Sequence, residues 1–331
     1  MESGKAFRFV EGLKGVFILK TAWKETTSIQ ELLQNKKRKG LFSKSEKAVP
    51  VVLFLMAAVS VLTTLGIVFT LIFETFTFFK EVSIGEFLTS KEWYPFSAEG
   101  SYGILPLVTG TLKITLIASM TAVPIGLAAA IYLSEYASDR VRRIMKPMLE
   151  VLAGVPTIVY GFFALTFVTP LLRSIFPELE MFNAISPGIV VGIMITPMIV
   201  SLSEDALSSV PKAVREGALA MGATKWEMTW RVVLPAAISG IVASIVLAIS
   251  RAIGETMIVS IAGGSTPTAS LDLTGSLQTM TSYIVQVSTG DAGFGTTIYY
   301  SIYAVGFTLF LFTLAMNLLA QRISKRFREE Y

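Results

Sequence analysis

EGALAMGATKWEMTWRVVLP, residues 216–235, is a short polar segment between two long apolar stretches of the chain. It is too hydrophilic to cross a bilayer. Gly222 predicts the end of a short amphipathic helix, because glycine readily adopts the conformation that closes a helix. Pro235 favours the first turn of a following helix inside the membrane. The segment therefore predicts a compact helical loop between two membrane spans; an ordinary connecting loop is the alternative.

The composition is that of an integral membrane protein. Of the 331 residues, 53% are hydrophobic and 16% are charged, and the mean hydropathy is +0.64. The chain has neither cysteine nor histidine, which excludes thiol catalysis and most zinc and haem chemistry, so no metal or cofactor is expected. The net charge of +4 comes from basic blocks that report topology, with nothing that points to nucleic acid.

Apolar runs predict six membrane-spanning helices with the chain in the cell membrane. They cover residues 48–73, 104–133, 147–172, 188–203, 234–262 and 296–320. Basic clusters lie beside alternate ends of these runs, and basic loops stay in the cytoplasm. We therefore expect both termini, Arg140 and Lys225 in the cytoplasm, and Glu92 and Asp272 outside.

The third apolar run predicts an irregular helix. Gly154, Pro156 and Gly161 lie close together in it, so the helix is expected to bend or open there. Freed backbone groups are tolerated in a membrane only where they face protein or a watery cavity. At the cytoplasmic end of this run, Lys146 is expected to pair with Glu150, one helical turn further along.

Two large side chains are expected at the membrane surface. Lys113 lies near the start of the second apolar run, and a lysine there is expected to extend its charged end to the interface. Trp93 precedes the same run, and tryptophan is enriched at the level of the lipid headgroups. Both side chains are therefore expected outside the protein core.

The fifth apolar run contains two charged residues, Arg251 and Glu255. A charge at mid-bilayer costs about 2.5–3.5 kcal/mol, so each is expected to face a partner, a cavity or a substrate. Their spacing predicts that both lie on one helix face, which continues in a row of small residues from Gly240 through Ser244 and Ala248 to Ala252. In one interpretation the two charges neutralise each other and lock helices together. In the other, Arg251 presents its guanidinium to an anion in a pathway.

The polar segment also carries a motif, formed by Glu216, Gly217 and Ala218, then Gly222, then Leu234 and Pro235. This layout resembles that of the permease subunits of binding-protein-dependent ABC importers. The resemblance implies an all-α membrane fold of six transmembrane helices, the type I (MetI-like) permease fold. It also implies that this loop lies on an ATPase subunit and couples ATP hydrolysis to transport.

Further stretches narrow the resemblance. RAIGETM, YGILPLVTGTL, AIYLSEYA and LEVLAGVPTIVYGFFAL are similar to segments of phosphate-specific permeases of the PstC subtype. This implies a subunit that forms half of the translocation pathway for inorganic phosphate. The implied partners are a second homologous permease, two ATP-binding subunits and an extracytoplasmic phosphate-binding protein. Arg251 is then expected to contact the anion transiently, with Glu255 as its resting counter-ion.

The alternatives are a permease for another oxyanion such as molybdate or sulfate, the sister PstA-type subunit, or a secondary transporter. The chain has no G-x-x-x-x-G-K-[ST] motif, so it is expected to be a transporter subunit without its own ATPase site. We expect a basic cytoplasmic tail, a first span with an external loop, a permease domain and a second cytoplasmic tail, over residues 1–47, 48–106, 107–322 and 323–331.

Overall fold

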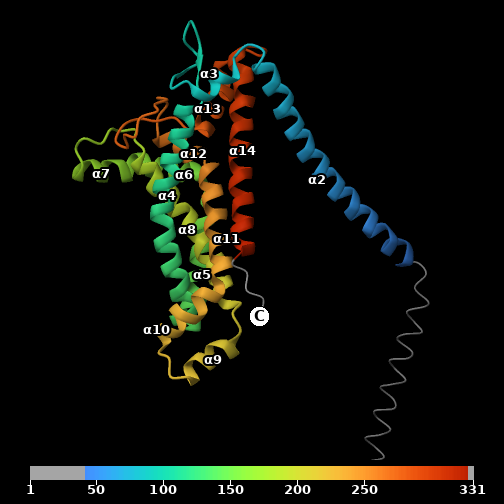
Figure 1. The fold of residues 1–331 in the computed structure, drawn as a ribbon, viewed down its shortest axis with the longest axis vertical. Coiled ribbons are helices and arrows are strands. Elements are labelled where there is room, and N and C mark those ends of the chain that lie inside the picture. The colour runs from blue at the N-terminus through green and yellow to red at the C-terminus, as the bar shows by residue number, and fades with distance from the viewer. Residues whose placement is uncertain (1–41, 327–331) are drawn as a thin grey trace, which may run out of the picture. The chain divides into compact units, whose positions relative to one another are not determined.

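The computed structural model describes residues 42–326, and helices dominate it (Figure 1). By length and composition, six of its helical runs are able to cross a membrane, which confirms the predicted all-α membrane fold. They are Ala48–Phe78, Leu105–Tyr136, Thr157–Ile175, Ile185–Ser208, Lys225–Ile253 and Thr297–Ile323. Two short strands in the described residues, β1 (Trp93–Tyr94) and β2 (Ser101–Tyr102), pair antiparallel.

The chain divides into two compact units, residues 1–69 and 70–331, and the division falls inside α2 (Phe42–Phe78). The described part of the first unit is one apolar helix. Most of the predicted N-terminal tail falls on residues 1–41 and part of the C-terminal one on 327–331, and both ranges lie outside the described residues. The elements discussed below belong to the second unit.

Two closely packed helices, α4 (Leu105–Ile131) and α8 (Ile185–Ser208), form the core of this unit. A Cβ atom on Gly188 would lie 2.7 Å from the Cβ of Ile117, well inside normal van der Waals contact. A Cβ atom on Gly192 would lie equally close to Thr121. Glycine at both positions therefore lets the two backbones approach, as small residues do between membrane helices.

The fifth span meets α8 through the small residues that the sequence singled out. Within α11 (Leu234–Ile253), Ser244 and Ala248 are buried, and a Cβ atom on Gly240 would lie 2.5 Å from the Cβ of Ala206 in α8. The prediction that this face of the fifth span packs against another helix is confirmed. Further sides of α11 pack against α4 and against the sixth span.

The third predicted span is broken where its glycine and proline content predicts. An amphipathic helix, α5 (Asp139–Gly154), ends just before Pro156. It is followed by α6 (Thr157–Phe163), the π-helical turn η2 (Ala164–Val168) and α7 (Thr169–Ile175). None of the α5 residues is buried, and the apolar run begins after the break, later than predicted.

The fifth span differs from its predicted bounds at both ends. Its helical run begins with α10 (Lys225–Met228) and a second π-helical turn, η3 (Thr229–Val233), so Pro235 lies inside the run and not at its start. At the other end, α11 stops at its cap Gly254, and α12 (Met257–Ala262) is a separate helix. The predicted single helix is therefore wrong, because a glycine with little helix preference ends it.

Several further helical segments gather at one end of the unit (Figure 1). They are α3 (Ile84–Thr89), α13 (Met280–Gln286), the π-helical turn η4 (Val287–Asp291) and the start of α14 (Thr297–Arg326). Trp93 is only 1% exposed there, and its ring lies edge-on to that of Tyr283, with the centroids 4.8 Å apart. Trp93 is therefore covered by an aromatic cluster of the protein, and its position at the membrane interface stays a prediction.

Lys113 is also inside the protein. It is 6% exposed, and its ammonium group donates a hydrogen bond to the backbone carbonyl of Asp272 at 2.6 Å. The expected extension to the membrane surface is wrong, because the segment before α13 folds over this end of α4. The carboxylate of Asp272 accepts hydrogen bonds from the backbone N–H and the hydroxyl of Thr274, and these bonds lower its pKa.

Candidate functional site

The polar loop forms a helix that is closed by its own backbone. In α9 (Lys212–Ala220), the last carbonyls are satisfied by a turn at Gly222, whose φ is +87°. The N–H of Gly222 bonds the carbonyl of Leu219, and the N–H of Ala223 bonds that of Ala218. This pair of bonds is the Schellman arrangement, which favours glycine at the positive-φ position. The predicted helix ending at Gly222 is confirmed.

A second cap closes the other side of the turn. The hydroxyl of Thr224 accepts a hydrogen bond from the backbone N–H of Glu227, and the carboxylate of Glu227 accepts one from the N–H of Thr224. This capping box starts the helical run that continues through Leu234 and Pro235 into α11. The loop is therefore rigid in itself and continuous with the fifth span.

The tip of the loop presents its side chains to the outside of the chain. Glu216 and Gly217 are exposed, and α9 has no buried residue. Three large apolar side chains are exposed beside them, with Leu219 at 46%, Met221 at 88% and Trp226 at 61%. A rigid loop that exposes apolar side chains around a carboxylate has the chemistry of a contact surface for another protein.

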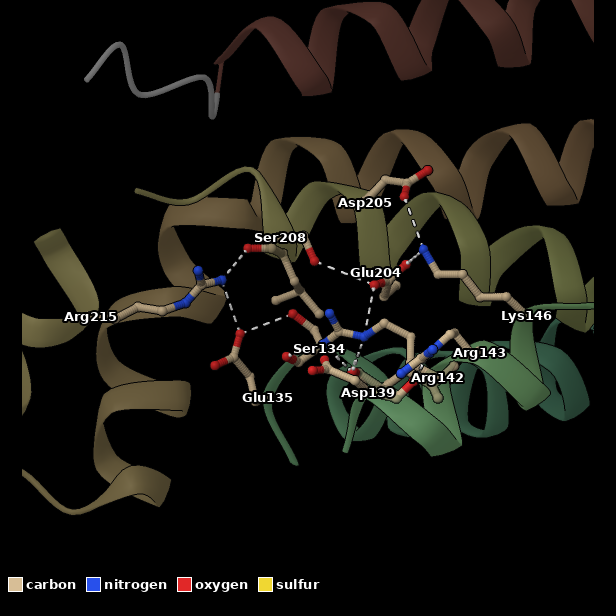
Figure 2. A network of polar contacts seen from close by, with 12 residues as sticks. Ser134, Glu135, Asp139, Arg142, Arg143, Lys146, Glu204, Asp205, Ser208 and Arg215 are labelled. Carbon is tan, nitrogen blue, oxygen red and sulfur yellow. Dashed lines mark hydrogen bonds and ion pairs between the residues drawn. The ribbon is translucent and has the colours of Figure 1, made fainter. Parts of the chain in front are cut away.

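One arginine ties this loop to the ends of two membrane helices (Figure 2). The guanidinium of Arg215 in α9 donates to the carbonyls of Leu207 and Val210, at 2.6 and 3.0 Å, and to a carboxylate oxygen of Glu135 at 3.1 Å. Glu135 lies in the π-helical turn η1 (Tyr132–Tyr136) at the end of α4. Side chains are 18% exposed for Arg215 and 5% for Glu135, so this ion pair is largely shielded from water.

The π-helical turn is held from two more sides. Arg142 of α5 donates to the carbonyls of Leu133 and Ser134 at 2.7 and 2.9 Å. Lys225 of α10 lies over the ring of Tyr136, with its ammonium 5.0 Å from the centroid. Side chains of α9, α10 and α5 therefore all contact the same turn at the end of α4.

Glu204 of α8 is the buried carboxylate of this region (Figure 2). It is 2% exposed and lies 2.5 Å from the ammonium of Lys146 and 3.7 Å from the guanidinium of Arg142. Lys146 faces Oε2 of Glu204, whereas Oε1 faces Arg142 and accepts a hydrogen bond from the Ser208 hydroxyl at 3.4 Å. Among the ion pairs of residues 42–326, none joins Lys146 to Glu150, so that expected local pair is replaced by one between α5 and α8.

Arg251 and Glu255, expected to pair, are separated by the end of α11. Glu255 is 8% exposed, and its carboxylate accepts hydrogen bonds from the backbone N–H groups of Met257 and Ile258, at the start of α12. Its carbonyl accepts a third, from the hydroxyl of Thr281. Arg251 is exposed, and no ion pair of the described residues joins it to Glu255. The expectation that one helix face carries both is therefore wrong.

Arg251 instead lines a cavity between α5, α8 and α11. The cavity has a volume of about 240 Å³, and its charged lining residues are Lys146, Glu150, Glu204 and Arg251. Apolar side chains such as Met194 form much of the remaining wall. This α5–α8–α11 cavity brings two cations and two carboxylates from separate helices to one space, so it offers charged groups that are able to contact a small ion.

Sequence reasoning did not single out Glu135, Glu204 or Arg215. Two of them have a signal that is visible only in hindsight: Glu204 directly follows an uncharged apolar run, and Arg215 directly precedes the motif at Glu216. Neither position names its partner, because the partners lie on other helices. The packing of α4, α5, α8 and α9 brings them together.

The comparisons with known proteins define the class. Residues 122–329 match the family described as "Binding-protein-dependent transport system inner membrane component". The fold is similar to that of the MetNI methionine ABC transporter in an inward-facing conformation, with a TM-score of 0.53 and 18% identity, over 68% of this chain and 98% of that one. The protein is thus a multi-pass membrane protein with the type I, MetI-like permease fold.

The chain belongs to this family of inner membrane transport components. It is 34% identical to the "Probable ABC transporter permease protein YqgH" of Bacillus subtilis, over 74% of this chain and 79% of that protein. It is also 34% identical to the "Phosphate transport system permease protein PstC" of Xylella fastidiosa, over 71% of this chain and 77% of that protein.

Proposed function

We propose that this chain is the transmembrane permease subunit of an ATP-driven phosphate importer and forms half of its translocation pathway. The observation that carries the proposal is the exposed loop at residues 216–235, which has the family motif and is joined by the neighbouring Arg215 to helices that line the cavity. Relatives named as phosphate permeases support the substrate.

The loop is proposed to rest on an ATPase subunit. Its exposed apolar side chains and Glu216 are free for such a contact, and Arg215 transmits the resulting motion to α8 and to η1. The chain itself carries no phosphate-binding loop for ATP, so two ATP-binding subunits supply the energy. A second homologous permease completes the pathway, and a phosphate-binding protein delivers the anion from outside.

Arg251 is proposed to be the anion contact on this pathway. It is exposed, it reaches the α5–α8–α11 cavity, and its guanidinium has no carboxylate partner among the described ion pairs. Glu255 is proposed to cap α12 and not to contact the anion, because its carboxylate accepts two backbone hydrogen bonds at the start of that helix. A guanidinium fork matches two oxygens of an oxyanion.

The test is uptake of radiolabelled phosphate by vesicles that contain the complete complex of permeases, ATPase subunits and binding protein. We expect uptake that requires ATP and the binding protein and that excess unlabelled phosphate suppresses. Uptake of labelled molybdate or sulfate, with no uptake of phosphate, would assign another oxyanion. Uptake that continues without an ATPase subunit would contradict the proposed importer class and favour a secondary transporter.

The proposed orientation places the loop and the N-terminus in the cytoplasm. Because the chain contains no cysteine, single cysteine variants are labelled without background. Lys225→Cys is expected to react with a membrane-impermeant thiol reagent only from the inside, and Asp272→Cys only from the outside. Labelling of Asp272→Cys from the inside would contradict this topology.

A further inference from the structure

A basic route leads out of the α5–α8–α11 cavity along α5. An open groove of about 560 Å³ is lined by residues of α5, one of which also lines the cavity: Asp139, Arg142, Arg143, Lys146 and Pro147. Its charged lining comprises three cations and one carboxylate. Lys146 is the residue that lines both the groove and the cavity. It therefore stands where the two spaces meet, with Arg251 on one side and the arginines of α5 on the other.

The ammonium of Lys146 is held by a carboxylate that has a second cationic partner. Its contact with Glu204 is 2.5 Å, and Asp205 lies further away at 3.9 Å (Figure 2). Glu204 also contacts Arg142, which is anchored by its bonds to the carbonyls of Leu133 and Ser134. If Lys146 turns away, Glu204 keeps Arg142 and its bond from Ser208. Both of these contacts are made to Oε1 of Glu204, so release of Lys146 leaves the buried Oε2 without a partner, which favours the return of the ammonium.

The two partners also differ in their access to water. The side chain of Lys146 is 41% exposed, whereas that of Glu204 is 3% exposed. The ammonium is thus the more accessible of the two groups, and Glu204 lines the same cavity beside it. An ammonium is a compact point charge on a flexible stem, so it is able to follow an anion over a short distance. A carboxylate that takes the ammonium back prevents the anion from staying bound.

We propose that Lys146 is a second anion contact, at the exit of the α5–α8–α11 cavity, and that Glu204 is its resting counter-ion. The anion leaves Arg251, displaces Glu204 from Lys146, and passes to the groove with Arg142 and Arg143. This inference rests on the proposed function. It adds an exit step and a residue that neither the motif nor the fifth span contains.

The first test removes the charge of Lys146 in the complete importer. Lys146→Gln is expected to lower the maximal rate of phosphate uptake about tenfold, because a charged hydrogen-bond partner of the anion is lost. Lys146→Arg is expected to retain most of the rate. The matched control is Arg140→Gln, which removes an exposed cation of the same helix that lines neither space and is expected to leave uptake unchanged.

The double variant Lys146→Gln with Glu204→Gln distinguishes an anion contact from a purely structural ion pair. Removal of both charges leaves no unpaired buried carboxylate, so assembly and thermal stability are expected to return to wild-type levels in either case. Our proposal expects uptake to remain low, because the anion contact is still absent. Recovery of normal uptake in the double variant would overturn the proposal and make the pair purely structural.

A charge-rescue experiment covers the case in which Lys146→Gln does not assemble. In the Glu204→Gln background, Lys146→Cys is treated with aminoethyl methanethiosulfonate, which restores a positive charge, or with methyl methanethiosulfonate, which does not. Uptake is expected to recover only with the charged reagent. Equal uptake with both reagents would overturn the role of Lys146 alone, whereas a wild-type complex that takes up no phosphate would overturn the proposed function as well.

Discussion

The two ends of the fifth helical run, Lys225–Ile253, are built in different ways. At one end, the turn at Gly222 and the capping box at Thr224 close the loop with hydrogen bonds between near neighbours in sequence. At the other, the break after Gly254 is closed by the buried carboxylate of Glu255 and by the hydroxyl of Thr281, from a helix far along the chain. The first end leaves its side chains exposed. At the second end, the side chains of Glu255 and Thr281 are buried and engaged in hydrogen bonds to the backbone.

This difference separates a contact surface from a structural joint. A loop that satisfies its own backbone keeps Glu216, Met221 and Trp226 free for a partner. A break that depends on a buried carboxylate has no such freedom, and the exposed charge beside it, Arg251, is the group that remains available. Variants at the two ends are therefore expected to fail in different ways, in coupling at one end and in stability at the other.

The largest effect is expected at the turn of the loop. Gly222→Asp is expected to abolish uptake while the chain still inserts and assembles, because it adds a charged, branched side chain at the tip and strains a φ of +87°. The control is Gly295→Asp, at a φ of +81° and likewise with open space around it. Both variants strain a glycine with positive φ, but only Gly222 lies in the loop proposed to contact the ATPase. Equal loss of uptake in both variants would therefore contradict a coupling role for the loop.

The next largest effect is expected at Arg251. Arg251→Ala is expected to lower uptake about 10- to 100-fold, because a charged hydrogen bond contributes about 1.5–3 kcal/mol. Arg251→Lys keeps the charge without the fork and is expected to lose less. Both rates are measured in vesicles, with binding-protein-stimulated ATP hydrolysis as the readout of intact coupling.

A charge swap checks that Arg251 acts without Glu255. The double variant Arg251→Glu with Glu255→Arg is expected to be inactive in uptake. The wild-type side chains are not paired, and α12 loses its capping carboxylate in the swap. Normal assembly and normal uptake by the swapped protein would show that the two residues form a structural pair and that Arg251 does not contact the anion.

A smaller effect is expected where the loop meets the helices. Arg215→Ala removes the guanidinium from the carboxylate of Glu135 and from the carbonyls of Leu207 and Val210, at a cost of about 1–3 kcal/mol of stability. We expect ATP hydrolysis to continue while uptake falls, because the loop still docks but no longer moves η1. Lys212→Ala, at an exposed position of the same helix, is the control. Parallel loss of hydrolysis and uptake would argue against transmission through Arg215.

The smallest effect is expected at Glu255. Glu255→Gln retains an oxygen that accepts the two N–H groups of α12, so uptake is expected to stay close to normal. Glu255→Ala removes the cap and is expected to cost about 1 kcal/mol, read as a lower melting temperature of the purified complex. A Glu255→Gln variant that is as inactive as Arg251→Ala would place Glu255 on the pathway instead.

The sequence by itself determined the features that depend on near neighbours. Apolar runs long enough to cross a membrane, the helix closed at Gly222 and the break before Pro156 all follow from hydropathy and backbone preference. The small residues of α11 likewise predicted a packed face, because a row of small side chains lets another helix approach closely.

The tertiary structure alone decided which charges meet. Trp93 and Lys113 are buried because distant segments cover them, and Lys146 pairs with Glu204 instead of its helical neighbour Glu150. An ion pair depends on which helices pack together, and that choice is made by contacts spread over the whole unit. Spacing along one helix fails as a guide when the helix ends early, and α11 ends between Arg251 and Glu255.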